Sequence, residues 1–155
     1  MKLNFSVKPI LSDGGVILFL FLLILLGLLK TAGAQINQVL EAENATLSGT
    51  AEIVNCNNAS NGEMVKGLDN GSSNSLEFQG INIPQSAAYF VSVKYYAVNE
   101  RILTYRINDE AAQIITVPKT GLWCYQGGAP GETVFEVQLE KGDNNVLFYL
   151  SLIHI

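Results

Sequence analysis

Short segments in which apolar and polar residues alternate recur along most of the chain, and they restrict its fold more than any other feature. Such alternation places successive side chains on opposite faces of a β-strand. In residues 134–139, for example, Phe135 and Val137 alternate with Glu136 and Gln138. Helical periodicity is almost absent, so we expect antiparallel sheets packed over one core. The expected strands are residues 39–44, 75–81, 89–97, 102–107, 113–117, 134–139 and 146–150.

The segments between these strands are rich in turn-forming residues, such as Asn108–Asp109 and Lys141–Asn144. About eight short strands separated by regular turns predict an all-β fold, an antiparallel β-sandwich. Residues 55–74 are rich in Gly and Asn and are expected to form a long irregular excursion. Long excursions in compact domains are often functional.

The N-terminal segment has the pattern of a secretory signal peptide. Val16–Leu29 is a run of fourteen residues without a charge, preceded by Lys2 and Lys8 and followed by Ala32-Gly33-Ala34. A basic region, an apolar region and small residues at a cleavage site define such a peptide. The alternative is an uncleaved membrane anchor, but a spanning helix needs about 20 apolar residues. We therefore predict cleavage after Ala34.

This prediction divides the chain into a signal peptide, residues 1–34, and one domain, residues 35–155. The domain is expected to be secreted, to the extracellular space or the periplasm, without stable insertion in a membrane. It keeps six basic and thirteen acidic side chains, a formal net charge of −7. An acidic domain with scattered cations is a poor partner for phosphate backbones, so nucleic acid is excluded as a ligand.

The C-terminus is unusual for a β-domain. After the strand at 146–150 the chain runs Ser151-Leu152-Ile153-His154-Ile155 without a turn or a polar tail. We therefore expect the domain to be truncated and incomplete at this end. His154 is the only histidine, which excludes any mechanism that needs an internal one.

A series of short motifs resembles the carbohydrate-binding modules of families 6 and 35. The likeness runs in order over residues 38–149, and each motif alone is weak. The motifs are Leu40–Ala45, Asn55–Val65, Leu68–Gly71, Ser75–Phe78, Ile83–Ala97, Thr120–Trp123 and Leu139–Asn145. The resemblance implies a galactose-binding-domain-like jelly-roll. It also implies a non-catalytic function, in which the module binds a polysaccharide or oligosaccharide and targets a secreted protein or an attached glycoside hydrolase to it.

The chain departs from the family at two places. Met64 stands where the family usually has an aromatic residue that helps to form the sugar platform. The family also ends with a further loop and strand that carry a ligand-binding Asn and an Asp, and this chain stops before both. These departures leave the expected ligand cleft and metal site incomplete in the sequence.

Glu41 and Glu43 are the candidate metal ligands. They lie two residues apart on an expected strand, so both carboxylates should project from one face. Like charges repel unless a cation or base compensates, and calcium prefers hard oxygen ligands. The spacing alone favours two solvated acids on an edge strand, whereas the resemblance implies a structural calcium ion. A glycosidase carboxylate pair is a third reading, but nothing in the sequence supports a cleft here.

Trp123 is the strongest candidate for sugar binding. It is the only tryptophan and lies in a Gly-rich loop, where its ring could stack on the apolar face of a sugar or fold back over the core. The resemblance favours a sugar platform, with Tyr125 as a weaker second aromatic. Arg101 could hydrogen-bond sugar hydroxyls or a uronate, or be a solvated strand charge. Loops carrying Met64, Arg101 and Trp123 are expected to form the rim.

Cys56 and Cys124 are the only cysteines, and both fall in loop-like segments. An even count in a secreted chain invites a disulfide, which would hold the first loop beside the Trp loop. The alternative is two free thiols too far apart to bond. The residues alone leave both possibilities open.

Three functions fit the sequence. The first is a non-catalytic carbohydrate-binding module. The second is a hydrolase in its own right, disfavoured by the small size and by the absence of a nucleophile motif such as G-x-S-x-G. The third is a structural or adhesion sandwich with no sugar ligand, because sandwiches carry many functions.

Overall fold

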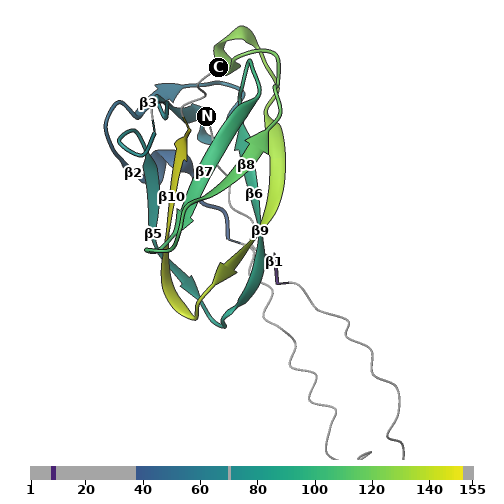
Figure 1. The fold of residues 1–155 in the computed structure, drawn as a ribbon. Coiled ribbons are helices and arrows are strands. Elements are labelled where there is room, and N and C mark those ends of the chain that lie inside the picture. Colours follow the sequence, from purple (N-terminus) through teal and green to yellow (C-terminus); the bar gives the residue numbers. More distant parts are fainter. Residues whose placement is uncertain (1–7, 10–37, 70, 152–155) are drawn as a thin grey trace, which may run out of the picture.

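The computed structural model describes residues 8–9, 38–69 and 71–151, and this part of the chain is an antiparallel β-sandwich with short 3-10 helices (Figure 1). Every paired strand runs antiparallel to its neighbour, which confirms the predicted fold class. The elements are β1 (Lys8–Pro9), η1 (Ala42–Asn44), β2 (Thr46–Leu47), β3 (Glu52–Asn55), η2 (Ser60–Gly62), β4 (Glu63–Lys66), β5 (Leu76–Ile83), β6 (Ala87–Tyr95), β7 (Arg101–Ile107), β8 (Gln113–Val117), η3 (Cys124–Gln126), β9 (Gly131–Leu139) and β10 (Gly142–Leu150).

Two sheets form the layers of the sandwich. One has the strand order β2-β5-β10-β7-β8, and the other has the order β1-β6-β9. In the second sheet β6 and β9 pair along their whole length, from Ala87 opposite Leu139 to Tyr95 opposite Gly131. The β3–β4 hairpin forms a separate two-stranded sheet.

The sequence predicted the six longer strands, β5 to β10, within a few residues, and it predicted β8 at its observed bounds. The expected strand at 39–44 is wrong. Its last residues form the 3-10 helix η1, because the Asn44 and Ala45 amides donate to the carbonyls of Glu41 and Ala42. The excursion at 55–74 is not wholly irregular, since it contains η2 and β4.

The predicted signal peptide lies outside the described residues, except for Lys8 and Pro9. These two residues form β1, which pairs with Phe90 and Tyr89 of β6. Within the described part of the chain, no helix is long and apolar enough to cross a membrane.

The core lies between the two sheets and follows the predicted alternation. Tyr105 of β7 shows how the layers meet. Its ring centroid lies 4.7 Å from that of Phe135 on β9, in the opposite sheet, and 6.3 Å from that of Phe148 on β10. Tilted aromatic pairs at such distances contribute beyond the area they bury. The two sheets are therefore joined by specific ring contacts as well as by aliphatic packing.

The β9–β10 turn is stabilised by a buried amide. The Asn144 side chain is 1% exposed, and its Nδ2 donates to the carbonyls of Glu140 (2.7 Å) and Gly142 (3.0 Å). Its Oδ1 accepts from the Glu140 amide (3.1 Å) and from Asn108 Nδ2 (3.3 Å). One side chain thus satisfies backbone groups of this turn and contacts the turn after β7.

We expect Asn144→Ala to lower the free energy of unfolding by about 2 kcal/mol, because it removes four hydrogen bonds and leaves buried backbone groups unpaired. Chemical denaturation followed by far-UV circular dichroism measures the change. The matched control is Asn82→Ala, which removes one exposed side-chain hydrogen bond to Asp143 and should change the free energy of unfolding by less than about 0.5 kcal/mol. Equal losses in the two variants would contradict the role given to Asn144.

Candidate functional site

A cavity of about 620 Å³ lies where the β3–β4 hairpin, the last residues of β6 and the start of β7 meet the Trp123 loop. All four predicted binding residues line it, although they are far apart in the sequence. They are Met64, Arg101, Trp123 and Tyr125. The structure therefore brings the predicted set together, and a role in binding stays a prediction for each of them.

The aromatic lining comes from two places. Trp123 is half-buried and Tyr125 is 74% exposed, and both belong to the loop between β8 and β9. Tyr95 ends β6 and Tyr96 follows it, and both are buried in the cavity wall. Burial raises the pKa of Tyr95 and of Tyr96, so both hydroxyls stay protonated near neutral pH. The cavity wall thus adds apolar surface and no phenolate charge.

Charged side chains lie around this aromatic lining. Lys66 Nζ and Glu52 Oε1 form an ion pair of 3.0 Å across the β3–β4 hairpin, and both side chains are exposed. Such a surface pair contributes little stability, so its groups can exchange partners readily. Arg101 begins β7 and is partly buried, and within the described residues its guanidinium has no ion-pair partner. The lining therefore offers hydrogen-bond donors and acceptors beside aromatic surface.

The predicted position of Met64 needs correction. Met64 does not lie on a loop at the rim, since it belongs to β4 and is only 3% exposed. It forms part of the cavity wall instead, packed against Cys56, Tyr96 and Cys124. For Trp123 the sequence left two alternatives, an exposed sugar platform or a ring packed over the core. The structure combines them, because Trp123 packs against Cys56, Tyr96 and Cys124 and also lines the cavity.

Sequence reasoning missed several lining residues as functional candidates. Tyr95 and Tyr96 stand side by side at the end of a strand, where two adjacent buried aromatic residues break the alternation. That break was a usable signal. Glu52 and Lys66 gave none, because they become neighbours only through the pairing of β3 with β4.

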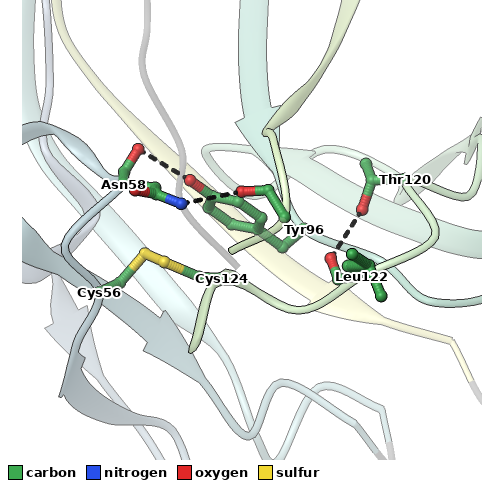
Figure 2. The surroundings of a disulfide bond; sticks show 7 residues. Cys56, Asn58, Tyr96, Thr120, Leu122 and Cys124 are labelled. Atoms are coloured by element: carbon green, nitrogen blue, oxygen red, sulfur yellow. Dashed lines mark hydrogen bonds between the residues drawn. A yellow bond between two sulfur atoms is a disulfide. The ribbon is translucent and has the colours of Figure 1, made fainter. Parts of the chain in front are cut away.

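Cys56 and Cys124 are joined in a disulfide, with their Cα atoms 5.7 Å apart (Figure 2). This is the first of the two alternatives left open by the sequence. The bond connects positions 68 residues apart and would add about 4 kcal/mol in the chain-entropy model. Asn58 lies beside it, where its carbonyl accepts from the Tyr96 hydroxyl (2.9 Å) and its Nδ2 donates to the Gly128 carbonyl (3.3 Å).

Glu41 and Glu43 lie outside the cavity, in and just before η1. The strand geometry predicted for them is wrong, but both carboxylates still reach one neighbouring segment, η2. Glu41 Oε2 accepts from Ser60 Oγ (3.1 Å), and Glu43 Oε1 accepts from Asn61 Nδ2 (3.2 Å). Among the described residues, no group of three or more His, Cys, Asp or Glu side chains could hold a metal ion.

No known family model matches the sequence, and no curated protein matches it. Solved structures do match. A family 35 carbohydrate-binding module from Clostridium thermocellum is 28% identical and superposes with a TM-score of 0.68, over 72% of this chain and 85% of that one.

Two further structures match at lower identity. The C-terminal family 6 module of a laminarinase from Zobellia galactanivorans is 21% identical, with a TM-score of 0.59 over 70% of this chain and 84% of that one. An exo-β-1,3-galactanase from Phanerochaete chrysosporium is 20% identical, with a TM-score of 0.63 over 71% of this chain but 25% of that one. These matches confirm the β-sandwich and the resemblance stated from the sequence.

Proposed function

We propose that this chain, which has the β-sandwich of family 6 and family 35 carbohydrate-binding modules, is a non-catalytic module that binds a glycan in the cavity beside Trp123. The convergence of Met64, Arg101, Trp123 and Tyr125 on one cavity carries the proposal. Its volume of about 620 Å³ lies in the range of small-molecule sites.

The lining suits a sugar in two ways. Sugar rings have apolar C–H faces, which pack on an indole or phenol ring, and Trp123 and Tyr125 supply both kinds at the opening. Sugar hydroxyls both donate and accept hydrogen bonds, and Arg101, Lys66 and Glu52 can meet either need. The same set is poorly suited to a nucleic acid, since Glu52 is acidic and pairs with Lys66, one of the two cations.

The affinity expected from this site is low. Each hydrogen bond contributes about 0.5–1.5 kcal/mol net because water competes for the same groups. An aromatic contact adds about as much again. A few such contacts correspond to a dissociation constant of about 0.1–1 mM.

A weak module of this kind acts by proximity. Linked to a glycoside hydrolase, it would raise the effective concentration of the enzyme at its substrate. The match to one quarter of the galactanase chain supports this arrangement, because the matched fold there belongs to a larger enzyme. The proposed site of action is outside the cytoplasm, in keeping with the predicted signal peptide and with the disulfide.

We also propose that a calcium ion binds between η1 and η2 as a structural cofactor. Glu41 and Glu43 would hold it, together with the Ser60 hydroxyl. These are hard oxygen donors, which calcium prefers, and the hydrogen bonds from Ser60 and Asn61 hold η2 beside the two carboxylates. The ion would neutralise two neighbouring carboxylates and join the two helices, without taking part in glycan chemistry.

The first prediction concerns the sugar platform. Trp123→Ala should weaken glycan binding about five- to tenfold, because it removes an aromatic contact of about 1 kcal/mol. Isothermal titration against β-1,3-galactan, laminarin and mannan oligosaccharides, with calcium present, measures the effect. The matched control is Phe90→Ala, which removes an exposed aromatic ring on the outer face of β6, away from the cavity.

A sugar that binds with the same affinity to wild type and to Trp123→Ala would show that the site is assigned wrongly. A folded wild-type domain that binds no member of a broad glycan array would refute the function itself. That result would favour a structural or adhesion sandwich. Turnover of chromogenic glycosides by the purified domain would contradict the non-catalytic assignment.

The second prediction concerns calcium. Adding calcium to chelator-treated protein should raise the melting temperature by about 5 °C, because a ligand that binds only the native state stabilises it. Glu41→Gln/Glu43→Gln should abolish this increase. The charge-matched control Glu132→Gln/Glu136→Gln changes two exposed acids on β9 and should retain it. Scanning calorimetry measures the melting temperature of each protein with calcium and with chelator. Equal melting temperatures of the wild type in the two conditions would exclude the site.

A further inference from the structure

We propose that the Cys56–Cys124 disulfide is a positioning element of the glycan site, which fixes Trp123 at the cavity while the sandwich itself folds without the bond. The inference deepens the proposed function and rests on it for its binding consequences. It assigns to the two cysteines a role in binding that does not require either sulfur to touch the ligand.

The buried hydrophobic residues in the described part of the chain form two separate clusters. The main core joins the two sheets through twenty buried residues, and it contains neither cysteine. A second group, here called the satellite cluster, packs apart from that core. Its members are Cys56, Met64, Tyr96 and Cys124, with Val54, Ala59 and Trp123 packed against them. The disulfide therefore lies at the centre of the satellite cluster and outside the main core.

The satellite cluster is also one wall of the cavity. Val54, Met64, Tyr96 and Trp123 belong to both. These residues come from the β3–β4 hairpin, the end of β6 and the loop before β9, which are distant in the sequence. Any movement of the loop against the hairpin changes the shape of the cavity, because the two sides of this wall belong to different segments.

Few bonds hold the loop to the hairpin side. Within the described residues, segment 121–130 is linked to segment 55–62 by the disulfide and by the hydrogen bond from Asn58 Nδ2 to the Gly128 carbonyl (Figure 2). Other bonds of the loop are local, such as the one from the Trp123 amide to Gln126 Oε1 (3.1 Å). Without the disulfide, this part-buried hydrogen bond of 3.3 Å and the packing of Trp123 in the satellite cluster would remain.

Trp123 depends most directly on this link. It immediately precedes Cys124, so the disulfide fixes the backbone of its neighbour in the chain. On the N-terminal side of Trp123, Thr120 is hydrogen-bonded to the sandwich. Its hydroxyl oxygen accepts from the Ala97 amide, and its own amide donates to the Ala97 carbonyl. Trp123 is therefore held between two anchors, and loss of one of them leaves it on a segment free to open locally.

The test compares the wild type with Cys56→Ala/Cys124→Ala. Far-UV circular dichroism and hydrogen exchange in β6 and β10 should show a folded sandwich. Hydrogen exchange in residues 121–130 should rise at least tenfold. Acrylamide quenching of Trp123, the only tryptophan in the chain, should increase after correction for its fluorescence lifetime.

Binding is then measured as a double-mutant cycle with Trp123→Ala. The cysteine variant should weaken glycan binding about as much as Trp123→Ala does, about five- to tenfold. Trp123→Ala in the cysteine-free background should add less than about a twofold further loss, because coupled residues are not additive. The stability control is Asn144→Ala, near the start of β10, whereas Leu150 at the end of β10 lines the cavity; this variant should leave the affinity unchanged.

Several outcomes would overturn the inference. A cysteine variant that fails to fold would show that the bond supports the sandwich. Unchanged exchange and quenching in the loop would show that the bond positions nothing, and independent losses in the binding cycle would show that it does not act through Trp123. If the wild type binds no glycan, the proposed function fails, whereas the exchange and quenching measurements still decide whether the disulfide positions the loop.

Discussion

The packing of the alternating apolar faces of the two sheets is the interaction on which the rest of this molecule depends. β6 pairs with β9 along its whole length, and β10 is held between β5 and β7. The contact of Tyr105 with Phe135 joins the two layers in the middle of the core. Because Trp123 and the two cysteines lie outside this core, the loop that carries Trp123 can hold a site without taking part in the packing of the sheets.

The sequence predicted the longer strands well because their alternation is sustained over five or more residues and the sandwich buries one face of most of them. It failed between residues 39 and 66 for a physical reason. β3 and β4 have four residues each, too few for a clear period, and Ile53 on β3 is 45% exposed. At η1, local bonds from residue i+3 to residue i prevailed over an alternation that suggested a strand.

The candidate site was predictable only in part. Trp123 could be singled out from sequence because it is the only tryptophan and lies in a Gly-rich loop, although only the resemblance favoured a sugar platform over packing on the core. Glu52 and Lys66 could not, since their proximity to the cavity follows from strand register. Met64 misled for the opposite reason, because its position in the resemblance suggested a rim whereas its strand places it in the wall.

The main core contains neither cysteine, whereas the cavity wall is cross-linked by the disulfide. This difference affects how weak contacts could bind a glycan. Ordering a mobile loop at the moment of binding costs free energy that a few hydrogen bonds and one aromatic contact could not offset. In the proposed site, the disulfide and the contact of Asn58 with Gly128 would order the Trp123 loop during folding instead. The contacts at the cavity would then contribute to affinity without this loss, which is what a site of such modest chemistry requires.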